Sequence, residues 1–119
     1  MSLLDLLREA AERLNAPVSL TEYKRDVPQR HRRVEISVPA WGYVTSASVE
    51  GGELQLTNDR LWAIVGALME NEERLALSYR ADYAEWSAVV IDDPLVHGDS
   101  SPVDAMCRAW LAAHPAEVA

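Results

Sequence analysis

The 119-residue sequence contains no phenylalanine, a single cysteine, and no apolar run near the length of a membrane span. A lone cysteine, Cys107, cannot form an internal disulfide, which agrees with a reducing compartment. A membrane-spanning helix needs about 20 consecutive apolar residues, so no membrane association is expected. The N-terminus also lacks the basic start and apolar centre of a signal peptide. Together these absences predict a cytoplasmic protein.

Basic residues are also few, since eleven Lys and Arg stand against nineteen Asp and Glu, for a formal net charge of -8. A net negative field opposes the approach of phosphate backbones, so direct nucleic-acid binding is not expected. Residues 50–104 hold twelve acidic residues and three arginines, a net charge of -9, whereas the stretch KRDVPQRHRR at 24–33 holds five basic residues and one aspartate. This stretch predicts a loop that either binds an anion or is simply solvated, in the second case complementing an acidic patch on another copy of the chain.

Three segments show the apolar spacing of helices. Ser2 precedes a pattern that ends near Asn15, and Asp5 lies where a capping carboxylate would. Thr57 or Asn58 precedes a second helical pattern over residues 59–70. Ser101 and Pro102 begin the third, which His114 and Pro115 end.

Between these helices the apolar residues alternate, as they do in strands with one buried face. Residues 34–38, 41–49 and 53–56 predict two or three antiparallel strands with a turn at Gly51 and Gly52, and residues 75–79 and 86–90 predict a second hairpin. The order is α-β-β(-β)-α-β-β-α. It predicts a single α+β domain over residues 1–119, in which an antiparallel sheet of four to five strands packs with three helices.

One loop carries residues that are typical of metal sites or catalysis, namely Asp92, Asp93, His97 and Asp99. Carboxylates and an imidazole can hold a divalent cation, which leaves open a small metal-dependent hydrolase or nucleotide-binding enzyme. However, the spacing of a calcium loop is missing, and turns recruit Asp and Gly for backbone reasons alone. We therefore expect no enzyme, assign no catalytic or metal-binding residue, and predict no cofactor.

The residues most typical of a protein-binding site fall in three groups. Arginine offers a forked guanidinium to carboxylates, and tryptophan and tyrosine dominate the energetics of protein interfaces. The alternative interpretation is that the arginines are solvated and that the aromatic rings are covered by helices. The candidate partner-binding residues are the basic Lys24, Arg25, Arg30, Arg32 and Arg33, the aromatic Trp41 and Tyr43, and the acidic Glu70, Glu72 and Glu73.

Residues 56–114 resemble small phage-encoded proteins of the ABA-sandwich or NinX-like type. The resemblance is carried by the helical stretch NDRLWAIVGALMEN, the hairpin residues YAEWSAVVI, and the segment SPVDAMCRAWLAAH. It implies a phage or prophage accessory protein in the cytoplasm of a bacterial host cell that binds a host protein or complex. Inhibition of that partner, in an anti-CRISPR or similar anti-defence role, would be one such use. A homodimeric assembly protein is a further alternative. In that reading the partner of the chain is a second copy.

Overall fold

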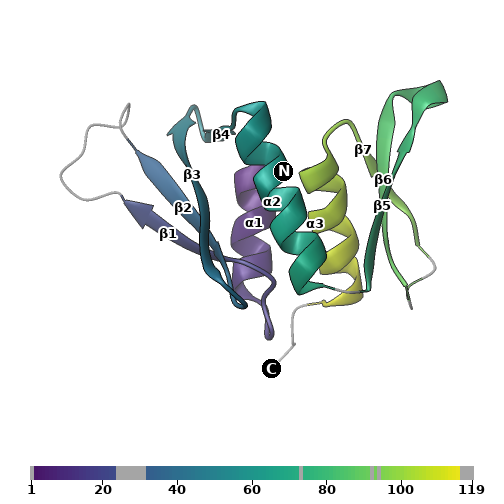
Figure 1. Ribbon diagram of the computed structural model, residues 1–119, viewed down its shortest axis with the longest axis horizontal. Coiled ribbons are helices and arrows are strands. Elements are labelled where there is room, and N and C mark those ends of the chain that lie inside the picture. Colours follow the sequence, from purple (N-terminus) through teal and green to yellow (C-terminus); the bar gives the residue numbers. More distant parts are fainter. Residues whose placement is uncertain (1, 24–31, 73, 92, 94, 116–119) are drawn as a thin grey trace.

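The structure is a computed structural model that describes residues 2–23, 32–72, 74–91, 93 and 95–115. Its three helices form a middle layer between two antiparallel sheets, one on each side (Figure 1). The α+β class and the three predicted helices are therefore confirmed. The prediction of a single sheet of four to five strands is corrected to two sheets, of four and three strands.

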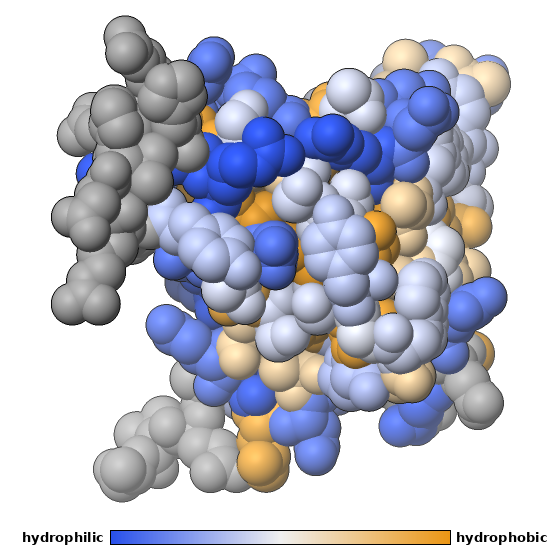
Figure 2. All heavy atoms as spheres, turned by 60° about the vertical axis from the view of Figure 1, so that its left-hand side comes forward, coloured by the Kyte–Doolittle hydropathy of each residue, from blue (hydrophilic) through white to orange (hydrophobic). Residues whose placement is uncertain are grey.

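The first sheet has the order β1-β2-β3-β4, from Ser19–Tyr23, Arg33–Val38, Gly42–Glu50 and Glu53–Gln55. In β2 the residues Val34, Ile36 and Val38 are buried and the residues between them are not, as the alternation predicts. The outward side of this sheet is largely hydrophilic or near-neutral, with apolar colour in small areas (Figure 2). The turn between β3 and β4 uses Gly51 and Gly52 at φ angles of 58° and 79°, a region that favours glycine.

The second sheet has the order β5-β6-β7, from Leu75–Arg80, Glu85–Val90 and His97–Asp99. A short 3-10 turn, Ala81–Tyr83, joins β5 to β6, and Ala84 completes it in the left-handed conformation at φ 48°. The pairing of β5 with β6 is continuous over all six residues of each strand. This hairpin was predicted, whereas β7 lies in a stretch that was predicted to be a loop.

The helices begin where the capping residues predict. Helix α1 (Leu3–Glu12) has a capping box in which Ser2 and Asp5 bond each other's backbone and side chain. Helix α2 (Asn58–Asn71) begins after Thr57, whose side chain accepts a hydrogen bond from the Arg60 amide at 3.4 Å. Helix α3 (Pro102–Ala113) begins with proline at its first position.

The packing of the helices divides them between the two sheets. Helix α1 contacts β1, β4 and α3; α2 contacts β2, β3 and α3; and α3 contacts all three strands of the second sheet. Buried side chains from every helix join one hydrophobic cluster, including Leu7, Ile36, Ile64, Ala88 and Met106. Consequently α3 is the helix that covers the second sheet most extensively. Among the described residues, no helix is long and apolar enough to cross a membrane.

The sequence did not predict strands β1 and β7, which have five and three residues. In β1 none of the five residues is fully buried, so the apolar alternation is weak, although the strand pairs with the whole of Arg33–Ser37. In β7 the three residues are His97, Gly98 and Asp99, which are typical of turns. Both strands form because a neighbouring strand offers a free backbone edge, a tertiary effect that local composition does not record.

Candidate partner-binding surface

Three aromatic rings meet where α2 approaches the second sheet. The ring centroids of Trp62 and Trp86 are 5.2 Å apart in a T-shaped arrangement, and those of Tyr79 and Trp86 are 4.8 Å apart at an interplanar angle of 48°. Both distances lie in the range in which aromatic pairs attract each other beyond their burial. Trp62 comes from α2, Tyr79 from β5 and Trp86 from β6, so this cluster bridges the middle layer and the second sheet.

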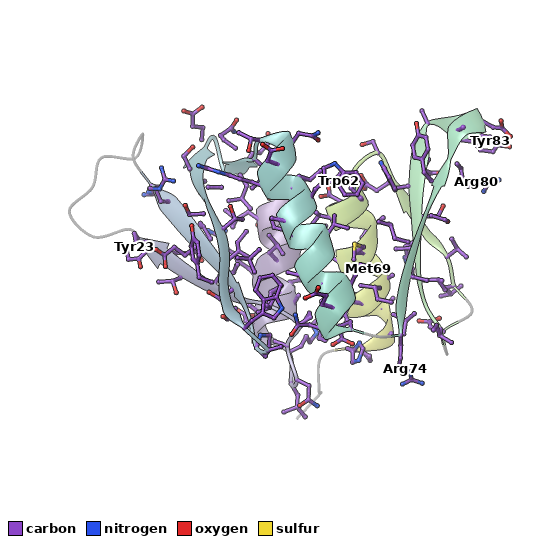
Figure 3. The ribbon with its side chains drawn as sticks, viewed as in Figure 1. Tyr23, Trp62, Met69, Arg74, Arg80 and Tyr83 are labelled. Atoms are coloured by element: carbon purple, nitrogen blue, oxygen red, sulfur yellow. The ribbon has the colours of Figure 1, made fainter. Side chains whose placement is uncertain are left out.

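The cluster remains open to solvent in spite of these contacts. The exposed fractions are 42% for Trp62 and 51% for Tyr79, while Trp86 is half-buried. Met69, with 40% of its side chain exposed, lies seven residues after Trp62 and thus on the same face of α2. In Figure 3 both labelled side chains lie on the side of α2 that faces the second sheet. We call Trp62, Met69, Tyr79 and Trp86 the aromatic surface.

Strand pairing explains why Tyr79 and Trp86 share a face. Tyr79 lies opposite Trp86, Leu77 opposite Ala88, and Leu75 opposite Val90. Opposite residues in an antiparallel pair point to the same side of the sheet. Ala88 and Val90 are buried in the core, so this side faces the helices. Leu77 is only partly buried, which places the aromatic surface at the margin of the core rather than on the outer side of the sheet.

The charges around the aromatic surface are mostly negative. Asp59, in the first turn of α2, precedes Trp62 by three residues, and Glu70 follows Met69; both are exposed. The last turn of α2 holds no basic residue, so its carbonyl groups and Glu70 together give this end a negative potential. Arg60 is directed elsewhere, since its guanidinium donates to the Ser46 carbonyl at 2.9 Å. A positively charged partner would therefore be favoured here.

The predicted partner-binding residues lie in two places. Trp41 and Tyr43, with 52% and 59% exposure, lie at the turn between β2 and β3. The Ala40 amide in that turn donates to the Asn71 side chain at 3.1 Å, so the turn adjoins the end of α2 that holds Glu70 and Glu72. Here the structure brings the predicted aromatic and acidic groups together. Four other predicted residues, Lys24, Arg25, Arg30 and Glu73, lie outside the described residues.

Arg32 and Arg33 lie at the opposite end of β2, beside a groove of about 580 Å³. Arg8 and Glu22 also line this groove and form a two-point ion pair, with N···O distances of 2.6 and 3.2 Å. The hydrogen bonding to Glu22 raises the pKa of Arg8 above its ordinary value. Arg33 donates to the Ser46 hydroxyl at 3.1 Å. Because Glu22 and Glu50 offset two of the three arginines, the described lining is close to neutral and gives weak support to an anion site.

Two of the carboxylates considered for catalysis, Asp93 and Asp99, form hydrogen bonds with neighbouring groups. Asp93 accepts a hydrogen bond from the Leu95 amide at 3.0 Å, and Asp99 accepts from the Ser101 amide at 3.1 Å and from Arg108 at 3.3 Å. No group of three His, Cys, Asp or Glu side chains that could hold a metal ion is found in the described part of the chain, which does not include Asp92. Burial raises the pKa of the Cys107 thiol to about 12, which keeps it protonated and unreactive.

The partner-binding residues predicted from the sequence include Trp41 and Tyr43 but not Trp62, Tyr79 or Trp86. A helical stripe identifies the apolar side of a helix, but Trp62 lies at the margin of that stripe, next to exposed Ala63. The available signal is the helical spacing, which places Trp62 in line with Gly66 and Met69 rather than with Ile64 and Leu68. Which strand Trp62 meets depends on how α2 packs against the second sheet, and this information is not local.

No protein family, curated protein or solved structure matches this chain.

Proposed function

We propose that this protein is a non-enzymatic binding protein that docks on a protein partner through the aromatic surface. The observation that carries the proposal is the contact of Trp62, Tyr79 and Trp86 in one cluster that stays about half exposed. Aromatic side chains supply large contact area at a low cost in conformational entropy, and tryptophan and tyrosine are enriched among the residues that dominate binding energy. Rings that are already held by one another lose still less freedom when a partner covers them.

The biological setting in this proposal is that of a phage or prophage accessory protein acting on a host protein or complex. The order of helix, hairpin and helix over residues 56–114 supports this setting through the resemblance described above. Inhibition of a host defence complex, as anti-CRISPR proteins achieve, is the form of action that requires binding alone. It fits a protein whose candidate catalytic carboxylates Asp93 and Asp99 are engaged in turn and helix contacts.

The test is affinity capture from nuclease-treated bacterial lysate, followed by titration of the purified partner against variants of the protein. Trp62→Ala should weaken binding at least tenfold, because removal of a central aromatic anchor costs about 2 kcal/mol or more. Leu14→Ala is the matched control. It also removes an apolar side chain, which is 72% exposed and distant in sequence from the residues of the aromatic surface. Equal binding by Trp62→Ala and Leu14→Ala would contradict the proposal.

Charge reversal at Arg32 and Arg33 distinguishes binding through the aromatic surface from binding through the groove at the other end of β2. If the partner binds the aromatic surface, the double variant retains wild-type affinity. Loss of binding in the arginine variant together with retention in Trp62→Ala would instead assign the contact to the groove. Circular dichroism of each variant establishes that it is folded.

A further inference from the structure

Strand β5 ends the second sheet and leaves one backbone edge unpaired among the described residues. The direction of its hydrogen bonds follows from one contact, in which the Ile91 amide donates to the Arg74 carbonyl at 2.7 Å. Hydrogen-bonded pairs alternate along an antiparallel ladder. Ala76, Ser78 and Arg80 therefore bond to β6, whereas the amide and carbonyl groups of Leu77 and Tyr79 point away from it.

A further contact agrees with this phase. The Leu75 amide donates to the Glu72 carbonyl at 3.1 Å, so it is directed away from β6 as the alternation requires. On the other side of β6, the same alternation leaves the amide and carbonyl groups of Trp86 and Ala88 for β7, and both residues lie within the stretch that pairs with β7. The free edge of β5 thus presents two donors and two acceptors in regular spacing.

The other sheet edges are protected in ways that β5 is not. Natural proteins protect edge strands by shortness, by inward-pointing charges and by irregular pairing. β4 and β7 have three residues each, and β1 carries Glu22, whose carboxylate is bound by Arg8. β5 has six residues, pairs without a register shift, and presents the half-exposed Leu77 and Tyr79 beside the edge.

The aromatic surface lies on the same side of the sheet as Leu77 and Tyr79, directly beside this edge. A strand added to β5 would place every second side chain next to the ring cluster and α2. Backbone hydrogen bonds would supply affinity, and the alternate side chains would supply specificity, which is the general logic of strand addition. Therefore the edge and the aromatic surface form one site for an extended polypeptide.

The charge around this site identifies the chemistry of the occupant. Residues 50–104, which include both α2 and the second sheet, carry twelve acidic residues and three arginines. Arginine and lysine side chains are attracted both to carboxylates and to the faces of tryptophan and tyrosine rings. These attractions act on the side of β5 that carries Tyr79, whereas on the other side Arg80 lies opposite Glu85. The occupant is basic at alternate positions only.

Resting on the proposed function, we propose that the partner contributes an extended segment that adds to the free edge of β5, with basic side chains at alternate positions over Trp62, Tyr79 and Trp86. A second copy of this chain fits the edge less well. In the antiparallel register centred on Leu77, a second copy would bring Leu75, Leu77 and Tyr79 to the side of the aromatic surface, and none of these residues is basic.

The test uses the full-length protein and an eight-residue peptide of alternating arginine and threonine, blocked at both ends. Its comparison peptide has the same sequence and charge but is N-methylated at alternate residues, so that one backbone edge cannot donate. Titration calorimetry at physiological salt should show binding of the first peptide and at least a tenfold weaker binding of the second. Amide hydrogen exchange at Leu77 and Tyr79 should slow only with the first.

A protein variant tests the same edge from the other side. Leu77→Pro removes one free donor, and Leu77→Val retains it while changing the side chain. The proline variant should bind the peptide at least tenfold more weakly than the valine variant. If Leu77→Pro does not fold, the comparison of the two peptides on the wild-type protein still tests strand addition.

Equal affinity for the two peptides, or no binding of either, would overturn the strand-addition proposal. Light scattering that shows a dimer dispersed by Leu77→Pro would overturn it in favour of a second copy as the occupant. The proposed function fails separately, by the partner titration with Trp62→Ala. A partner that needs Trp62 but ignores Leu77→Pro would retain the proposed function and remove strand addition.

Discussion

Proline substitutions at two adjacent residues of β5 should have very different costs. The Ser78 amide is directed at β6, where Ser78 lies opposite Ser87, whereas the Leu77 amide is directed away from β6. Proline has no amide hydrogen, and within a sheet it is tolerated at an edge position whose amide faces solvent. Ser78→Pro therefore breaks the β5–β6 ladder, and Leu77→Pro does not.

The structure gives the approximate size of the difference. Ser78→Pro loses a hydrogen bond with a net value of about 1 kcal/mol and leaves the Ser87 carbonyl unpaired, at a further cost of about 1–3 kcal/mol. The second cost applies because Ser87 is buried, with 7% exposure. Leu77→Pro loses part of a half-buried apolar side chain, a cost of about 1 kcal/mol. We expect Ser78→Pro to be less stable than Leu77→Pro by about 2 kcal/mol.

Urea denaturation followed by circular dichroism measures the free energy of unfolding of both variants. Ser78→Ala and Leu77→Ala serve as controls that change the side chains and keep the amides. Equal destabilisation by the two prolines, or a greater loss for Leu77→Pro, would refute the assigned hydrogen-bond direction. The free edge of β5, and with it the strand-addition proposal, would then lose its basis.

Three other properties follow from individual contacts. Cys107 is 4% exposed and its pKa is raised to about 12 by burial, so a thiol reagent at neutral pH should modify the unfolded protein and leave the native protein unmodified; rapid native labelling would contradict this. Hydrogen bonds from Ser2 lower the pKa of Asp5, so its stabilising effect is present above the ordinary carboxyl pKa and is lost as the pH falls through the lowered value. Asp5→Asn should flatten the acid side of the stability profile, and an unchanged acid side would count against the capping box. A double-mutant cycle of Arg8 and Glu22 should give a coupling of about 0.5–1 kcal/mol that decreases with salt, because both side chains are partly exposed; no coupling at low salt would contradict the ion pair.

The sequence predicted the elements whose pattern is local. Ser2 with Asp5 and Ser101 with Pro102 located two helix starts, and the alternation of Val34, Ile36 and Val38 located a strand. The distribution of strands between two sheets was not predicted. Both sheets use the same alternating pattern, and the two are distinguished by which helices cover them, since α3 packs on the second sheet whereas α1 and α2 pack on the first.

The candidate site was predicted only in part. The sequence identified Trp41 and Tyr43 as candidates and left open whether these rings were covered by a helix. Trp41 and Tyr43 are exposed, whereas Trp62 and Trp86 cover each other incompletely. Whether a ring is buried depends on the angle at which α2 meets the second sheet, and this angle follows from contacts between residues distant in sequence.

The most direct measurement of the central claim is the dissociation constant of the captured partner for the wild type, Trp62→Ala and Leu14→Ala, with all three shown to be folded. We expect Trp62→Ala to bind at least tenfold more weakly and Leu14→Ala to match the wild type. Wild-type affinity in Trp62→Ala would contradict the claim that this protein acts through its aromatic surface.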